Sequence, residues 1–258
     1  MLKFRTINIT FFLIAIVLLI INKTIDLHKY VYLILFLSWL SITTIGSFNI
    51  LWNYHLNAYN SNITIAGNKV AITFDDGPNK EFTPKILALL KKYDAKATFF
   101  CIGKNIETNA TLFKQIVEEG HIVGNHSYTH SNNFGFFSTS NVVNEIVKTN
   151  KLSFDLIEKE MKLFRPPFGV TNPSISKAIK KTTHSVIGWS VRSLDTVIKD
   201  DKKILKRITK RLTSGDVILL HDTSERSVKV LEQLLLFLQE NKFEIVTVDK
   251  LFDIEAYA

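Results

Sequence analysis

Two short strings of the sequence combine residue types that can hold a metal ion. Asp75 and Asp76 follow the apolar run at residues 70–74, which predicts a buried strand, so both carboxylates stand where that strand turns into a loop. His126 and His130 are four residues apart, which places both imidazoles on one face if the segment is helical. Two His and one carboxylate, with one position left open to water, are typical of catalytic rather than structural zinc sites.

Each string alone also has a simpler interpretation. Asp-Asp-Gly after a strand is often only a turn, and a His pair at this spacing is more often a solvated helix face. Two further strings follow in order, however: residues 165–169 after a short apolar stretch, and residues 219–222 at the end of the apolar run 217–220. The last of these puts His221 at another strand end, where parallel α/β folds place their catalytic residues.

At these four strings the chain resembles the polysaccharide deacetylases, carbohydrate esterase family 4, also called the nodulation-protein-B homology domain. Residues 73–77, 126–130, 165–169 and 219–222 are similar to the first, second, third and fifth motifs of that family. The resemblance covers residues 69–253. It implies an α/β fold, a distorted or incomplete (β/α) barrel, and the hydrolysis of N-acetyl groups on sugars.

The resemblance also implies a role for each motif residue. The implied metal ligands are Asp76, His126 and His130. The implied catalytic residues are Asp75 as the general base, Arg165 as its brace, and His221 as the acid that protonates the departing nitrogen. Leu219, Phe168 and Trp189 would line the substrate pocket, and the backbone near Phe168 would help to hold the oxyanion. The ligand set suits one divalent transition metal, with zinc preferred and cobalt, manganese or nickel as alternatives.

The fourth motif departs from the family pattern. Arg192 stands where the Asp that orients the catalytic His is expected, and Thr196 stands where a Trp is expected. Without its carboxylate, an imidazole loses orientation and basicity, and a nearby cation lowers its pKa further. We therefore expect His221 to be a weaker acid–base group, or to use another partner such as Asp195.

Length and composition leave room for one domain and a more apolar part. Of 258 residues, 46% are hydrophobic and 22% are charged. Residues 6–22 and 30–51 carry no charge, and either stretch can span a bilayer. A signal peptide is the alternative for the first stretch, but no small-residue cleavage site precedes Lys23. We therefore expect two transmembrane helices in a membrane anchor over residues 1–52, a polar tether over 53–68 and the deacetylase domain over 69–258.

The charges that flank the two apolar stretches favour the two possible membrane orientations almost equally. Lys3 and Arg5 precede the first stretch, whereas no Lys or Arg occurs between Leu51 and Lys69. That scarcity, and the family's cell-wall members, favour a cell-membrane protein whose catalytic domain is extracytoplasmic.

The net charge of +8 concentrates in patches at residues 177–181 and 199–211. Such patches suit anionic partners, but a solvated helix face is the favoured interpretation. No nucleic-acid motif is present, so we expect no nucleic-acid partner. Cys101 is the only cysteine, which excludes an internal disulfide.

Strand and helix patterns alternate after the tether, which predicts a parallel sheet. Expected strands lie near residues 70–74, 97–101, 121–124, 162–164, 184–189, 217–220 and 244–247. Expected helices fill residues 83–92, 111–119, 140–160, 173–181, 200–212 and 224–241. Seven strands rather than eight indicate an incomplete barrel.

Three functions fit these patterns. The first is a metal-dependent N-deacetylase acting on amino sugars of a cell-wall glycan or related polysaccharide. The second keeps this chemistry but acts on a lipid-linked amino sugar, because the apolar stretches would hold the site near the bilayer. The third is an inactive carbohydrate-binding domain with an eroded fourth motif. The intact acid, base and ligand residues argue against the third. The individual glycan and the oligomeric state stay open.

Overall fold

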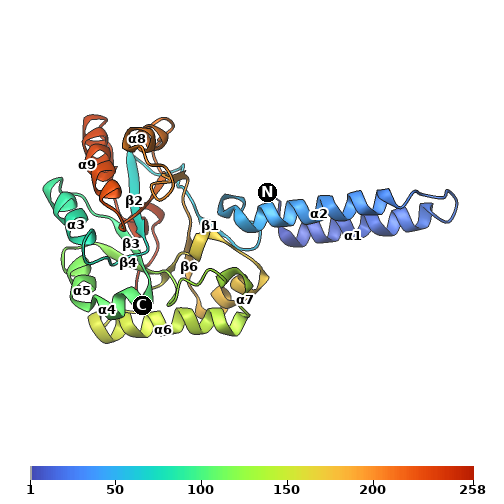
Figure 1. Cartoon of the computed structure of the whole chain (residues 1–258), viewed down its shortest axis with the longest axis horizontal. Coiled ribbons are helices and arrows are strands. Elements are labelled where there is room, and N and C mark those ends of the chain that lie inside the picture. The colour runs from blue at the N-terminus through green and yellow to red at the C-terminus, as the bar shows by residue number, and fades with distance from the viewer. Residues whose placement is uncertain (1) are drawn as a thin grey trace.

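A curled parallel sheet forms the centre of the domain that follows two long N-terminal helices (Figure 1). The structure is a computed structural model and describes residues 2–258. The strand order is β1-β6-β5-β4-β3-β2-β8-β7, and β9 pairs with β2. All these pairings are parallel. The strands are β1 (Ala58–Tyr59), β2 (Lys69–Asp75), β3 (Thr98–Cys101), β4 (Ile122–Asn125), β5 (Leu163–Phe164), β6 (Ser185–Ile187), β7 (Val191–Arg192), β8 (Val217–His221) and β9 (Glu244–Ile245).

Helices cover the outside of this curled sheet (Figure 1). They are α3 (Thr83–Lys92), α4 (Gly103–Thr108), α5 (Ala110–Glu118), α6 (Thr139–Ile157), α7 (Pro173–Thr182), α8 (Asp201–Thr209), α9 (Glu225–Glu240) and α10 (Val248–Phe252). Helix α9 shows why such segments form: Ser224 caps its N-terminus, and Val230, Leu234 and Leu238 repeat at helical spacing and are buried.

The expected fold class is confirmed, because the sheet is an incomplete barrel with helices around it. All seven expected strands occur. Two more, β1 and β7, are only two residues long and lie in polar sequence, so no apolar run announces them.

Residues of β2 alternate between the two sides of the sheet, as strand geometry requires. Val70, Ile72 and Phe74 pack into the larger hydrophobic cluster, together with α3, α5, α8 and α9. Ala71 belongs to the second cluster, on the side of β2 that Thr73 and Asp75 share. The same alternation that builds the core therefore turns Asp75 toward the inside of the barrel.

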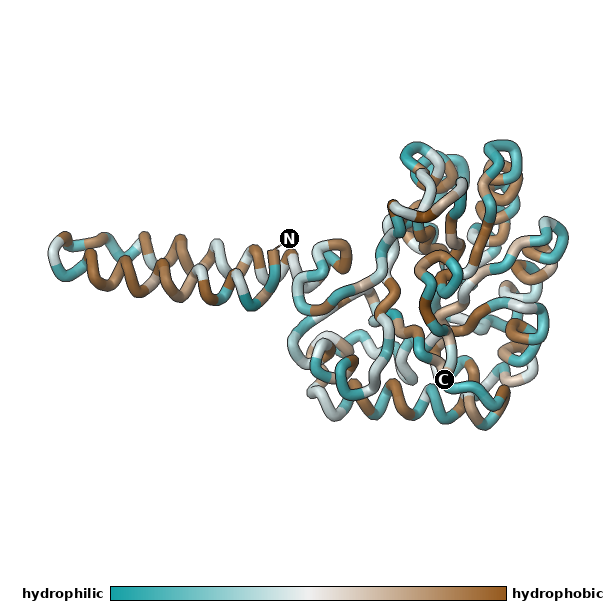
Figure 2. The backbone as a smooth tube through the Cα atoms, turned by 180° about the vertical axis from the view of Figure 1, so that it is seen from behind, coloured by the Kyte–Doolittle hydropathy of each residue, from teal (hydrophilic) through white to brown (hydrophobic). Residues whose placement is uncertain are grey.

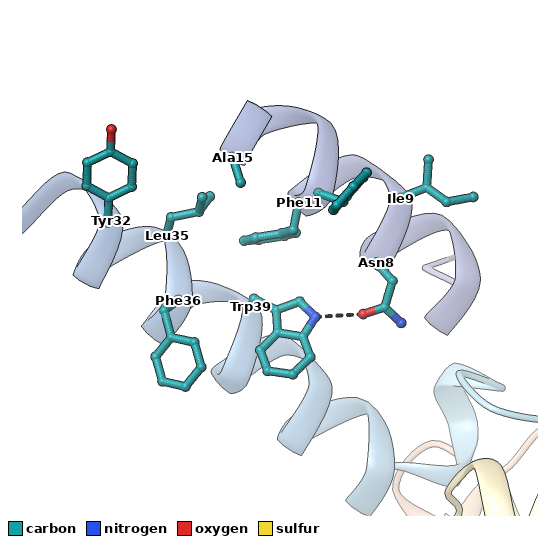
Figure 3. Close-up of a pocket in the computed structure, with 9 residues that line it drawn as sticks. Asn8, Ile9, Phe11, Ala15, Tyr32, Leu35, Phe36 and Trp39 are labelled. Carbon is teal, nitrogen blue, oxygen red and sulfur yellow. Dashed lines mark hydrogen bonds between the residues drawn. The ribbon is translucent and has the colours of Figure 1, made fainter. Parts of the chain in front are cut away.

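The N-terminal helices α1 (Phe4–Ile21) and α2 (Tyr30–Phe48) form a hairpin that projects away from the domain (Figure 1). Both are long and apolar enough to be candidate membrane spans, and Figure 2 shows hydrophobic residues along most of the hairpin. Trp39, in the middle of α2, donates from Nε1 to Oδ1 of Asn8 at 2.8 Å, beside a cavity of about 650 Å³ (Figure 3). Each of these two polar groups therefore has a partner between the helices.

The base of the hairpin is attached to the domain. The amide of Thr171 donates to the carbonyl of Ser47 at 2.9 Å, and the amide of Phe4 donates to the carbonyl of Tyr54 at 3.0 Å. Tyr54 is buried against Gly46, where a Cβ would lie only 2.5 Å from its ring. The last turn of α2 is therefore packed against its surroundings, and the hairpin is fixed where it meets the domain.

The segment expected as a polar tether, residues 53–68, is instead part of the domain. Its strand β1 pairs with β6 at the edge of the sheet. Asn62 donates from its backbone to the carbonyl of Gly215 at 2.8 Å and from Nδ2 to the carbonyl of Leu251 at 2.7 Å. The Asn residues that indicated a loop form hydrogen bonds that attach this segment to the domain. The expectation of a separate polar tether was therefore wrong.

Candidate active site

The motif residues that lie far apart in sequence meet at the carboxyl ends of adjacent strands. Strand β2 ends at Asp75 and pairs with β8 so that Asp75 lies opposite His221. Strand β4 ends at Asn125, directly before His126, and pairs with β5, which leads into Arg165. This is the edge where parallel sheets place ligand-binding and catalytic groups.

Asp76 lies at the centre of a cluster of imidazoles. Its Oδ1 is 3.5 Å from Nε2 of His126 and 3.3 Å from Nε2 of His130, and its Oδ2 is 4.0 Å from Nε2 of His221. Burial by itself raises the pKa of Asp76, but the three imidazoles lower it to about 2. Asp76 is therefore a carboxylate at neutral pH.

The His pair is held by a loop, so the one-face geometry considered for a helical segment does not apply. Ser127 and His130 both have a positive φ, so the chain turns sharply after β4. Nδ1 of His126 lies 2.7 Å from the carbonyl of Arg165, an acceptor, so this nitrogen carries the proton. Nε2 of His126 is thus left to face Asp76.

Glu145 on α6 fixes this loop, a role that the motifs did not reveal. Its carboxylate accepts from the amides of Tyr128 and Thr129, at 3.0 Å and 2.7 Å, and from the Thr129 hydroxyl. A Glu on an amphipathic helix has no signature that separates it from a surface residue. Only its long-range contacts show that it positions the two His side chains.

Asp75 and Arg165 form a buried ion pair. Nη1 of Arg165 donates to Oδ1 of Asp75 at 2.6 Å and to the Thr73 hydroxyl at 2.8 Å. Nε and Nη2 donate to the carbonyls of Ile187 and Gly188. Because Arg165 is wholly buried and its donors are shared among these oxygens, it holds the Asp75 carboxylate in one orientation.

His221 has a carboxylate partner after all, and it is Asp195. Nδ1 of His221 donates to Oδ1 of Asp195 at 2.8 Å, and the His221 amide donates to Oδ2 at 2.8 Å. Burial lowers the pKa of His221, but the hydrogen bond and charge of Asp195 raise it to about 9.

Of the two alternatives expected for His221, the structure therefore shows the second, because Asp195, three residues after Arg192, takes the place of the orienting carboxylate. Leu194 has a positive φ, which lets the chain turn after β7 and bring Asp195 under the imidazole. Hydroxyls of Ser193 and Ser227 also donate to Asp195. Arg192 lies elsewhere, with its guanidinium 5.8 Å from the Trp189 ring.

Gly77 leaves room for a further buried Asp side chain, that of Asp222. A Cβ at this position would overlap the side chain of Asp222. The Thr83 hydroxyl donates to Oδ2 of Asp222, and burial raises the pKa of Asp222 to about 7. The Gly of the first motif is therefore required by packing against the Asp of the last one.

The three expected pocket residues have different surroundings. Phe168 has a positive φ, is 47% exposed, and meets the His130 ring edge-on at 4.6 Å. Trp189 is buried against Gly169, where a Cβ would lie 2.4 Å from its ring. Leu219 is also buried and belongs to the same hydrophobic cluster as Trp189. The exposed Phe168 ring is thus the one of the three available to a ligand.

The donor set of Asp76, His126 and His130 fits a transition metal. One ligand atom from each lies within 4.8 Å of the others. Oδ1 of Asp76 is buried and has no hydrogen-bond partner among the described residues, although it faces two imidazole nitrogens. A buried carboxylate oxygen without a partner is costly, and a cation shared with two imidazoles would satisfy it.

Comparison with known proteins agrees with this geometry. Residues 63–187 match the polysaccharide deacetylase family model. A peptidoglycan-N-acetylglucosamine deacetylase of Bacillus cereus (strain ATCC 14579) is 37% identical over 190 residues, which are 70% of this chain and 87% of that protein. Peptidoglycan-N-acetylglucosamine deacetylase PgdA of Listeria monocytogenes serotype 1/2a (strain 10403S) is 35% identical over 71% of this chain. The match spans only 39% of the length of PgdA.

A solved structure is similar over most of the domain. The Bc1960 peptidoglycan N-acetylglucosamine deacetylase, in complex with 4-naphthalen-1-yl-N-oxidanyl-benzamide, superposes with a TM-score of 0.73 at 33% identity. The superposition covers 78% of this chain and 94% of the other. With the motif residues assembled at one edge of the same incomplete barrel, the chain belongs to the polysaccharide deacetylase family.

Proposed function

We propose that the protein is a metal-dependent hydrolase that removes N-acetyl groups from amino sugars of a cell-wall glycan. The observation that carries the proposal is that three groups of side chains meet at the carboxyl ends of the strands. They are the Asp75–Arg165 pair, the Asp76–His126–His130 cluster and the Asp195–His221 pair. A base, a ligand set and an acid are what amide hydrolysis needs. Relatives named as peptidoglycan deacetylases support the glycan as substrate.

Asp75 suits the role of general base. Arg165 holds its carboxylate in one orientation, and Oδ2 lies 3.8 Å from Nε2 of His126, next to the ligand cluster. Asp75 can therefore take a proton from an attacking water without being a ligand itself.

His221 suits the role of general acid. Asp195 binds its Nδ1 proton, which leaves Nε2 directed toward the cluster, 4.0 Å from Asp76. The raised pKa keeps the imidazole protonated at neutral pH, so a proton is available for the departing amine nitrogen.

Asp76, His126 and His130 would hold one divalent transition metal, with zinc preferred. When bound there, such an ion lowers the pKa of water and polarises the acetyl carbonyl. Phe168, exposed beside His130, offers an aromatic face for the sugar ring. Trp189 and Leu219 would shape the inner wall of the pocket.

Acetate release by the full-length chain tests this function. We expect release from chito-oligosaccharides or from peptidoglycan, loss of release with a chelator, and recovery when zinc is returned. The matched control is Glu118→Gln, at an exposed position on α5, which should retain full activity. No acetate from either glycan with the metal-loaded protein would contradict the proposal.

A lipid-linked amino sugar is the second candidate substrate. The bond between Thr171 and Ser47 ties the end of α2 to the loop that follows Phe168, so one wall of the site lies close to the hairpin. A lipid-linked N-acetylglucosamine, assayed beside the two glycans, decides between them. Faster acetate release from the lipid-linked sugar than from either glycan would favour this candidate.

We also propose that the hairpin anchors the chain in the cell membrane with the domain outside. Cys101 is buried, so a single introduced cysteine can be labelled without background. Ile63→Cys, at a position that is 87% exposed, should react with a membrane-impermeant thiol reagent in intact cells or spheroplasts. Thr24→Cys, in the turn of the hairpin, should react only after lysis. The reverse pattern would place the domain in the cytoplasm.

A further inference from the structure

A groove lined by basic side chains runs beside α8, and its lining shares no residue with the proposed active site. It has a volume of about 590 Å³. Six basic side chains line it, all of them exposed: Arg192, Lys203, Lys206, Arg207, Lys210 and Arg211. The four from Lys203 to Lys210 follow the spacing i, i+3, i+4 and i+7, so they share one face of the helical segment, whereas Ile204 and Ile208 are buried.

These cations are not neutralised by the protein. None of the six lies within 4.0 Å of a carboxylate among residues 2–258. Two acids lie near them: Asp216, which also lines the groove, accepts from Ser190 and Thr213, and Asp201 lies 3.8 Å from Arg226. A set of unpaired cations around one hollow attracts an anion more strongly than scattered surface lysines do.

The basic groove continues into a second hollow at the base of the hairpin. This hollow has a volume of about 490 Å³ and shares Ser190, Arg192 and Arg207 with the groove. Its other wall is the end of α2 and the turn after it, where Ile45, Phe48 and Leu51 are 50%, 69% and 45% exposed. Cations and exposed apolar side chains therefore meet at the point where the candidate spans reach the domain.

Arg207 lies at the junction and is oriented for an outside acceptor. Its Nε donates to the carbonyl of Arg192 at 2.8 Å, which orients one edge of the guanidinium. Its Nη atoms have no acceptor among the described residues. A guanidinium with free Nη donors suits a phosphate, to which Arg binds with two parallel hydrogen bonds.

We propose that this groove binds the headgroup of an anionic phospholipid from the membrane that holds the hairpin. The phosphate would lie at Arg207 and Arg192, and the acyl chains would lie against Phe48 and Leu51. The position next to the end of a span, and the pairing of phosphate donors with apolar walls, favour a membrane lipid over a soluble anion. The site would fix how the domain sits on the bilayer. This inference rests on the proposed membrane anchorage but not on the proposed deacetylase activity.

Native mass spectrometry of the full-length chain in detergent tests the site by titration with phosphatidylglycerol and phosphatidylcholine. We expect saturable binding of phosphatidylglycerol and at least tenfold weaker binding by Arg207→Gln/Lys210→Gln. The control pair is Lys114→Gln/Lys151→Gln, which removes the same charge from exposed positions on α5 and α6 and should leave the affinity unchanged. Arg207→Lys should weaken binding by less than the double variant, because it keeps the charge but loses the paired donors.

Several outcomes would overturn the proposal. Equal affinities for the groove pair and the control pair would show that net charge alone binds the lipid. Tighter binding of soluble poly(glycerol phosphate) than of phosphatidylglycerol would assign the groove to a wall polymer. If carbonate extracts the chain from membranes without detergent, the chain is not anchored by the hairpin. The proposed lipid site is then rejected together with the anchorage. Acetate release from chito-oligosaccharides, measured on the same samples, reports separately on the deacetylase function.

Discussion

The loop after β4 and the end of β8 both hold an imidazole by its Nδ1, but they use different partners. His126 donates to the neutral carbonyl of Arg165, whereas His221 donates to the charged carboxylate of Asp195. Both rings direct Nε2 toward Asp76. One site thus contains two His side chains of similar geometry and different electrostatics.

The difference in partner explains how one residue type can serve two roles. A carbonyl fixes the tautomer of His126 without adding a charge at Nδ1, so Nε2 can serve as a metal ligand once it has lost its proton. A carboxylate stabilises the protonated ring, so His221 can give a proton away. The following predictions test this division of roles, beginning with the largest expected effect.

Removing a ligand imidazole should have the largest effect. His126→Ala or His130→Ala should lose the bound metal and reduce acetate release to background, because one carboxylate and one imidazole no longer complete the set. Elemental analysis of the purified variants measures the metal, with His221→Ala as the comparison that should retain it. Wild-type metal content in both ligand variants would refute the assignment.

Asp75→Asn should abolish most turnover while the metal stays bound. General-base catalysis contributes roughly 10²–10⁴-fold, and this loss is expected in kcat. The variant also leaves the buried Arg165 without its charge partner, so we expect a loss of about 3–5 kcal/mol in the free energy of unfolding. Denaturant titration measures this loss. A variant that loses its metal would show that Asp75 and Asp76 have been assigned the wrong roles.

Asp195→Asn should weaken His221 as an acid without removing the ring. We expect a loss of up to about 10²-fold in kcat, at the low end of what a general acid contributes. Without the carboxylate that raises it to about 9, the pKa of His221 should fall. Since the protonated form is the active one, the alkaline limb of the pH–rate profile should move to lower pH. An unmoved limb with reduced kcat would mean that Asp195 has only a structural role.

Glu145→Gln should have the smallest of these effects and should act on the His126–His130 loop alone. The variant keeps the shape of the side chain but weakens the bonds to the Tyr128 and Thr129 amides, so metal affinity should fall about tenfold. Saturating metal should restore kcat, and Glu118→Gln is the control. A lower kcat at saturating metal would indicate that Glu145 affects more than ligand placement.

Much of the fold was predictable because local sequence patterns determine it. The apolar runs that became β2 and β8 need no distant partner to be recognised, and the boundaries of α3 agree with the expectation. The motif residues followed from the same runs, because each motif lies at a strand end. Short elements in polar sequence, β1 and β7, could not be found in this way.

The site was predictable in its residue types and less so in its partnerships. Asp195 is three positions from where the fourth motif places its carboxylate, and the turn at Leu194 decides that it reaches His221. Glu145 and the carbonyl of Arg165 act across 16 or more residues of sequence. Contacts of this kind depend on how strands and helices distant in the chain are registered against each other.

The sequence by itself determined the alternation of strands and helices, the two apolar stretches and the set of residues that can do the chemistry. Only the tertiary structure decided which carboxylate serves His221, that residues 53–68 belong to the domain, and that the basic face of α8 meets the end of α2. The physical reason is the sequence separation over which the two kinds of interaction act. Periodicity and turn chemistry act between neighbouring residues, whereas the charge and tautomer of each side chain are set by the groups that folding places beside it.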